Sequence, residues 1–138
     1  LGACEVVDSS LTNDKSSRPL LRPAWAGAFD VIGGNTLATI LKSVSYGGNV
    51  VTVGNIESHE LKTTVFPFIL NGINLLGVGT QDTPMSLRTQ LWNLLADDWK
   101  PDNMNDILTE IGFDELDQYL SIMITKKSRG RILLNLDS

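Results

Sequence analysis

The sequence predicts an α/β protein whose sheet consists mainly of parallel strands. Short runs rich in β-branched and aliphatic residues alternate with stretches that carry apolar residues at helical spacing. The connections between them are short, and glycine follows several of the apolar runs. The predicted strands are apolar on both faces, which is typical of parallel strands covered by helices.

The first part of the chain is predicted to contain a short strand, an irregular connection and a buried strand. Glu5–Asp8 is a run with two valines that ends in a polar cluster, which favours a strand. Residues 9–26 mix serine, proline, aspartate and arginine without a sustained period, so they are predicted to form a connection. Residues 28–33, with the sequence AFDVIG, are apolar enough for an interior strand.

A helix is predicted over residues 35–45, because its apolar residues recur at the i, i+3, i+4, i+7 spacing of one helical face. Asn35 or Thr36 is expected to cap its start, and Gly47 to take a left-handed conformation after its end. The apolar run at residues 49–54 is the next strand. The residues of the helical face are Leu37, Ile40, Leu41 and Val44.

The same alternation continues to the end of the chain. A short helix is predicted at residues 63–72, a strand at 73–80 and a longer helix at 82–99, with leucines in one stripe. Residues 107–113 and 131–136 are predicted strands, and 114–130 a helix between them. The residues of this last helix expected to face inward are Leu116, Tyr119, Leu120, Met123 and Ile124.

Composition excludes several classes of function. The chain has 138 residues, enough for one domain, with 42% apolar and 20% charged residues. Its net charge of -5 argues against a nucleic acid or an anionic membrane as partner. The single cysteine, Cys4, is expected to be a small buried residue and excludes a disulfide framework and a cysteine-rich metal site. Neither a membrane span nor a signal peptide is evident, which predicts a cytoplasmic location.

A binding edge is predicted where the strands end, because open parallel sheets bind ligands beyond the carboxyl ends of their strands. Three strand ends carry glycine or a small polar residue: Ile32–Asn35, Val53–Asn55 and Val78–Thr80. Gly33 and Gly54 would let a flat ligand approach the backbone, or would simply serve tight turns. The G-x-G-x-x-G and G-x-x-x-x-G-K-[ST] phosphate-binding motifs do not occur in the sequence.

Few residues suggest covalent or metal chemistry. His59 is the one histidine, and its polar surroundings favour a solvated loop residue over a general base. No metal-ligand spacing is present, so no metal site is predicted. Arg131 follows Gly130 at the start of the last strand, where it could meet a phosphate or carboxylate or form a surface salt bridge.

Three stretches resemble one known family. Residues 25–55, 63–84 and 129–136, which include the sequences WAGAFD, PFIL and RGR, are similar to the YhdH/YhfP group of medium-chain dehydrogenases/reductases. The resemblance runs from Leu1 to about Leu136. Members of this group are named quinone oxidoreductases or acryloyl-CoA reductases, and they contain no zinc.

The resemblance implies an NADPH-dependent reductase of activated carbon–carbon double bonds, such as an enoyl thioester or a quinone. Hydride then goes to the β-carbon and a proton to the α-carbon. Residues 1–138 would be the later part of a Rossmann-type nucleotide-binding domain that lacks its first strands. The last strand, residues 131–136, would return toward a catalytic domain absent from this sequence. The chain, which opens without methionine, would then be inactive alone and hold no catalytic residues.

The resemblance also implies the cofactor contacts. Asn55 corresponds to a position near the nicotinamide half, Ile69 and Thr80 to positions that line the dinucleotide, and Arg131 to an arginine that reaches the cofactor. Ser9 stands where relatives can carry an arginine near the adenosine phosphate, which weakens the implied preference for NADPH over NADH. Gly33 and Gly54 complete the expected set. Subunits of the family pair through sheet edges, which predicts a homodimer through the edge strand 73–79.

Two other functions stay open on the sequence alone. One is a non-catalytic dimerisation module that pairs through the same apolar edge strand. The other is a different nucleotide-binding α/β protein, such as a short regulatory domain. In the usual 3-2-1-4-5-6 strand order, two strands that are not in this sequence lie between Glu5–Asp8 and residues 28–33. We therefore expect residues 1–26 to pack irregularly or to be paired by another copy.

Overall fold

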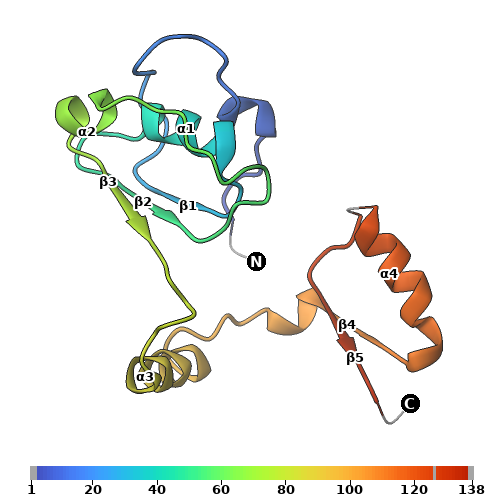
Figure 1. Ribbon diagram of the computed structural model, residues 1–138. Helices are drawn as coiled ribbons and strands as arrows, with labels where there is room; N and C mark the ends of the chain where they lie inside the picture. The colour runs from blue at the N-terminus through green and yellow to red at the C-terminus, as the bar shows by residue number, and fades with distance from the viewer. Residues whose placement is uncertain (1–2, 126, 137–138) are drawn as a thin grey trace. The chain divides into compact units, whose positions relative to one another are not determined.

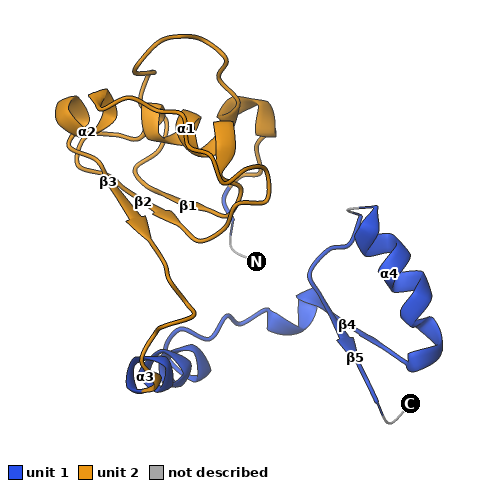
Figure 2. Ribbon diagram, viewed as in Figure 1, with its two compact units in different colours: residues 1–4, 86–138 blue, residues 5–85 orange. Residues whose placement is uncertain are grey.

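The computed structural model describes residues 3–125 and 127–136, and the chain divides into two compact units. Figure 2 shows the larger unit, Glu5–Met85, in orange and the described residues of the smaller one, Leu1–Cys4 with Ser86–Ser138, in blue. Both units contain parallel strands connected by helices, so the predicted α/β class with a mainly parallel sheet is confirmed.

The larger unit is built on a three-stranded parallel sheet in the order β1-β2-β3 (Figure 1). The strands are β1 (Ala28–Asp30), β2 (Asn49–Thr52) and β3 (Asn74–Gly77), with Ala28 opposite Val50 and Val50 opposite Leu75. Each lies inside a predicted strand but is shorter. The helices α1 (Gly34–Ser43) and α2 (Phe66–Asn71) connect them, as predicted.

The core of this unit lies between α1 and the sheet. Leu41, Val44 and Val50 are completely buried, because the helical spacing turns one face of α1 toward β2. Burial of each such side chain contributes about 1.5–3 kcal/mol to the free energy of unfolding. The whole buried cluster comprises Leu37, Ile40, Leu41, Val44, Val50 and Ile73.

The predicted strand at Glu5–Asp8 is wrong. These residues are exposed and outside any strand, and they precede a short 3₁₀-helix, η1 (Ser9–Thr12). A β-branched run becomes a strand only when a neighbouring strand accepts its backbone hydrogen bonds, and none lies beside it in the part of the chain that the structure describes. Cys4 is likewise exposed, not buried as expected. The irregular packing expected for the N-terminal residues is confirmed for residues 3–26.

The connection after η1 is held against α1 by polar contacts. The Lys42 ammonium lies 3.0 Å from the Asp14 carboxylate, and the Asp14 backbone N–H donates to Thr39 Oγ1 at 2.9 Å. Hydrogen bonds from Lys42 and from Ser16 hold the pKa of Asp14 below its usual value of 3.8. Since both charged side chains are largely covered, this pair fixes one end of an otherwise irregular segment.

The smaller unit contains a parallel pair of strands joined by a helix. Here β4 (Leu108–Ile111) pairs with β5 (Arg131–Leu134), and α4 (Leu116–Ile124) connects them. The remaining elements of this part of the chain are α3 (Met85–Ala96), η2 (Met104–Ile107) and η3 (Phe113–Glu115).

The inward face predicted for α4 is only partly right. Leu116 and Tyr119 are half-buried, whereas Leu120, Met123 and Ile124 are exposed. The leucine stripe of α3 is also largely exposed. Helical spacing places these residues on one face, but a face is buried only where another layer covers it.

Candidate functional site

A cavity of about 260 Å³ opens beside the carboxyl ends of β1 and β2. Gly33 follows β1, Gly54 and Asn55 follow β2, and all three line this cavity. The structure therefore brings together three of the seven predicted site residues, at the strand edge where the sequence placed them. The other lining residues are Gly34, Leu37, Thr52, Ser58, His59, Glu60, Leu61 and Leu75.

Asp30, the last residue of β1, shapes this edge from inside the protein. Its side chain is 2% exposed, and its carboxyl oxygens accept hydrogen bonds from the Gly33 N–H at 3.1 and 3.2 Å. The same group accepts from the Ile32 N–H at 3.2 Å and from Thr52 Oγ1 at 3.3 Å. One buried carboxyl group thus ties the turn after β1 to the end of β2.

The backbone conformation and the close neighbours of Gly33 and Gly54 explain why both positions are occupied by glycine. Gly33 has φ 73° and ψ −155°, a conformation essentially restricted to glycine, and its position leaves no room for a Cβ beside the Ser58 carbonyl. At Gly54 a Cβ would lie 2.7 Å from the carbonyl oxygen of Val31. Both glycines therefore serve close backbone approach within the chain, which was one of the two interpretations of these residues.

The loop after β2 folds back along the turn after β1. The backbone N–H groups of Val53 and Glu57 donate to the carbonyls of Asp30 and Ile32, each at 2.8 Å. The loop then ends in a bridge between Ser58 and Gly33. These hydrogen bonds fix the turn after β1 and the loop after β2 to each other. The backbone of both segments therefore forms an ordered wall of the cavity.

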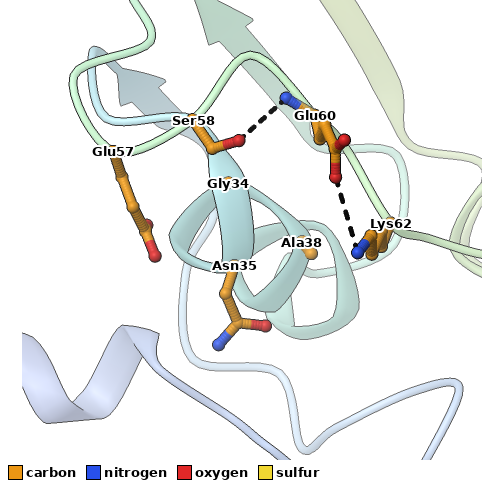
Figure 3. Close-up of a pocket in the computed structure, with 7 residues that line it drawn as sticks. All are labelled: Gly34, Asn35, Ala38, Glu57, Ser58, Glu60 and Lys62. Atoms are coloured by element: carbon orange, nitrogen blue, oxygen red, sulfur yellow. Dashed lines mark hydrogen bonds and ion pairs between the residues drawn. The ribbon is translucent and has the colours of Figure 1, made fainter.

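The start of α1 is closed by this same loop and not by the predicted caps. The Gly34 N–H donates to the Ser58 carbonyl at 3.1 Å, and the Thr36 N–H donates to Glu57 Oε2 at 3.4 Å. No side chain at the N-cap position caps the helix, so the capping role expected for Asn35 or Thr36 is wrong. Figure 3 shows Glu57 and Ser58 beside the first turn of α1.

This closure limits what α1 can bind. A helix N-terminus attracts phosphate through its free N–H groups and its positive dipole end. Here the N–H groups of Gly34 and Thr36 already donate to the Ser58 carbonyl and the Glu57 carboxylate. The start of α1 is therefore poorly suited to a pyrophosphate, in keeping with the absence of a phosphate-binding motif.

The other predicted site residues lie elsewhere. Ile69 is 67% exposed on α2, Thr80 is exposed beyond the end of β3, and Ser9 is exposed at the start of η1. Arg131 begins β5 in the smaller unit, where its Nη1 donates to the Gly130 carbonyl at 3.1 Å. Of the two interpretations of Arg131, the surface salt bridge does not occur among the described residues.

Sequence reasoning missed three residues that build this edge: Asp30, Glu57 and Ser58. The one local sign was the spacing of Asp30 to Gly33, an aspartate that can accept from backbone N–H groups two and three residues later. Contacts of Glu57 and Ser58 with α1 cross more than twenty residues and leave no local pattern. His59 is exposed, as expected for a loop residue, although it also lines the cavity.

Neither a metal centre nor a membrane span is found in the described residues. Nowhere in residues 3–125 and 127–136 do three or more histidine, cysteine or acidic side chains gather as metal ligands would. Within the same ranges, the helices are too short or too polar to cross a bilayer.

No family model matches the chain, but individual proteins do. Over 137 residues, or 99% of the chain, it is 34% identical to YhfP of Bacillus subtilis, whose name assigns it provisionally to the quinone oxidoreductases. Over all 138 residues of this chain, it is 30% identical to the acrylyl-CoA reductase AcuI of Ruegeria pomeroyi. In both cases the match covers 42% of the relative, so the chain spans about two fifths of the curated relatives' length.

Two solved structures resemble the chain closely. The crystal structure of Bacillus subtilis YhfP with NAD bound has a TM-score of 0.88 at 34% identity, covering 98% of this chain and 41% of that one. The crystal structure of Escherichia coli K-12 YhdH with bound NADPH has a TM-score of 0.82 at 36% identity, covering 96% of this chain and 41% of that one. The fold predicted from the sequence therefore corresponds to part of longer nicotinamide-nucleotide-binding proteins.

Proposed function

The chain is homologous over nearly its whole length to the YhfP, YhdH and AcuI oxidoreductases, and on that premise we propose that it is the nicotinamide-side segment of an NADPH-dependent reductase. The substrate class is an activated carbon–carbon double bond, as in acryloyl-CoA or another enoyl thioester, or a quinone. Residues 1–138 form the later part of the nucleotide-binding domain, and residues 131–136 return toward a catalytic domain.

One observation supports this proposal most. Gly33, Gly54 and Asn55 surround a single cavity at the carboxyl ends of two adjacent parallel strands. The position of this cavity beyond the strand ends suits a planar ring, which the nicotinamide of a bound NADPH would supply together with its hydride. Since α1 is closed by Glu57 and Ser58, the pyrophosphate would be bound elsewhere than at the start of α1.

The remaining proposed contacts have separate roles. Ile69 and Thr80 would line the dinucleotide, and Arg131 would offer a guanidinium to one of its charged groups. Ser9, a short neutral side chain, would leave the adenosine 2′-phosphate less tightly held than an arginine would. No catalytic residue is assigned to this chain, which by itself would be inactive. The zinc-free mechanism and the cytoplasmic location expected from the sequence are parts of the same proposal.

A chimera tests this function directly. This chain would replace the corresponding segment of Bacillus subtilis YhfP, which supplies the missing regions. We expect the chimera to oxidise NADPH in the presence of acryloyl-CoA or a quinone. We further expect Arg131→Ala in the chimera to raise the dissociation constant for NADPH about tenfold, because a charge-assisted hydrogen bond is lost.

Arg129→Ala is the matched control, since it removes an exposed arginine two residues earlier. It should leave the dissociation constant unchanged, as measured by quenching of NADPH fluorescence. A chimera with native-like circular dichroism that neither binds nor oxidises NADPH would contradict the proposed function. Equal losses in the two variants would contradict the role of Arg131 alone.

We also propose that two copies pair through β3, within the edge segment 73–79. In the described residues β3 pairs with β2 on one side, and the exposed apolar residues of segment 73–79 include Leu76 in β3 and Val78 just after it. The N–H groups of Asn74 and Val78 donate to the carbonyls of Gly48, just before β2, and of Thr52, so the N–H of Gly77 faces the free edge. An apolar strand edge with free donors can add a strand from a second copy.

We expect Gly77→Pro to weaken this association about tenfold or more, because proline removes an edge donor and its ring obstructs the approach of a second strand. Sedimentation velocity over a range of concentrations measures the effect. Gln81→Pro, in the exposed turn beyond segment 73–79, is the control and should associate as the unchanged chain does. A chain that is monomeric throughout would exclude both this dimer and the alternative function of a dimerisation module.

A further inference from the structure

A second cavity, of about 390 Å³, is lined by three basic side chains, and we call it the basic pocket. It is formed by the connection at residues 16–19, by the last turn of α1 and by residues 61–64. Three of the 11 lysine and arginine residues of this acidic chain line it, with four hydroxyl side chains and no carboxylate. Its polar lining consists of Arg18, Lys42, Lys62, Ser16, Ser17, Thr63 and Thr64.

The Arg18 side chain makes one hydrogen bond to a neighbouring residue of the same connection. Its Nε donates to Ser16 Oγ at 3.2 Å, and Ser16 Oγ donates in turn to Asp14 Oδ2 at 2.9 Å. The terminal nitrogens of the guanidinium donate to no other residue in the ranges that the structure describes. A guanidinium that is hydrogen-bonded through Nε and has free terminal N–H groups is suited to bind an anion through two parallel hydrogen bonds.

The net charge of the pocket is positive after its ion pairs are counted. Lys42 is balanced by Asp14 at 3.0 Å, in a pair that is largely covered. Lys62 contacts Glu60 at 3.4 Å, but these side chains are 88% and 61% exposed, so water and salt screen that pair. Arg18 has no carboxylate within ion-pair distance among the described residues. Arg18 therefore contributes an unbalanced positive charge.

The end of α1 does not oppose an anion as strongly as a free helix end would. A helix C-terminus is negative because its last carbonyls lack partners. Here the Lys42 carbonyl accepts from the Leu21 N–H at 2.8 Å, and the Ser43 carbonyl accepts from the Ala24 N–H at 2.8 Å. These donors come from the same connection that forms one wall of the pocket, and they reduce the negative potential at this helix end.

We propose that the basic pocket is a binding site for a phosphate group, either as free phosphate or as a phosphate ester. Phosphate presents several oxygens on different sides, which matches the Arg18 guanidinium and the hydroxyls of Ser17 and Thr64, contributed by two segments that face one pocket. The pocket shares only Leu61 with the cavity at the strand ends. It is therefore a site separate from the proposed nicotinamide edge, and it does not depend on the proposed reductase function.

The test is a titration of the 138-residue chain with inorganic phosphate and with glycerol 3-phosphate, followed by amide chemical shifts at constant ionic strength. We expect saturable shifts at residues 16–19 and 61–64. The compound that binds more tightly identifies whether the site takes free phosphate or an ester. Arg18→Gln should raise the dissociation constant about tenfold or more, because it removes the charged donor.

Arg22→Gln is the matched control, because Arg22 lies exposed in the same connection but outside the pocket. It should bind phosphate as the unchanged chain does. If Arg18→Gln fails to fold, the exposed Lys62→Gln takes its place, with a smaller expected increase. The proposal is overturned if neither phosphate compound gives saturable shifts, if acetate binds equally well, or if Arg22→Gln weakens binding as much as Arg18→Gln or its substitute.

Discussion

Replacing Gly33 with alanine is expected to lower the free energy of unfolding of residues 5–85 by about 4 kcal/mol. The backbone there has φ 73° and ψ −155°, which a residue with a Cβ adopts only under strain. The added methyl group would also collide with the Ser58 carbonyl. Either the bridge between these residues breaks or the loop after β2 moves, and the wall of the strand-end cavity is lost with it.

Gly47→Ala separates the effect of backbone strain from that of the collision with the Ser58 carbonyl. Gly47 also has φ 73°, but nothing lies within 4 Å of the place where its Cβ would be. We expect this variant to lose about 1 kcal/mol, from backbone strain alone. Urea titrations followed by the amide signals of Leu41 and Val50 report on the core of this unit specifically. Equal losses for the two variants would show that the contact with Ser58 does not limit stability.

Asp30→Ala is expected to have the next largest effect, a loss of about 3 kcal/mol. The Gly33 N–H would lose its acceptor in a buried turn, and Thr52 Oγ1 would lose one of its partners. An unsatisfied buried donor costs about 1–3 kcal/mol, to which the other lost hydrogen bonds add. Because the turn after β1 carries Gly33, this variant should also alter the cavity at the strand ends.

Two further substitutions test whether lost buried hydrogen bonds cause the destabilisation by Asp30→Ala. Asp30→Asn keeps a carbonyl oxygen that can accept from the Gly33 N–H, so we expect it to recover most of the loss. Asp8→Ala removes a carboxylate that accepts from the Ser10 N–H in an exposed turn, and a much smaller effect is expected. The same urea titration measures all three. A loss for Asp30→Ala no greater than that for Asp8→Ala would contradict the role given to the buried hydrogen bonds.

The wrong predictions share a physical origin. Glu5–Asp8 has the composition of a strand, yet no strand in the described chain accepts its hydrogen bonds. Leu120, Met123 and Ile124 have helical spacing, yet no layer covers them. In both cases the local pattern specifies what a segment can become, while burial and pairing depend on a second segment.

The sequence by itself determined the alternation of strands and helices, the buried face of α1 and the strand edge at which Gly33, Gly54 and Asn55 meet. These features follow from residue spacing and from glycine placement over a few residues, which a single chain displays directly. Only the tertiary structure decided that Glu57 and Ser58 close α1, and that Arg18, Lys42 and Lys62 line one pocket. Those contacts join residues some twenty or more positions apart. Polar contacts over such separations produce no period in the sequence, because each depends on where the backbone between its partners has been folded.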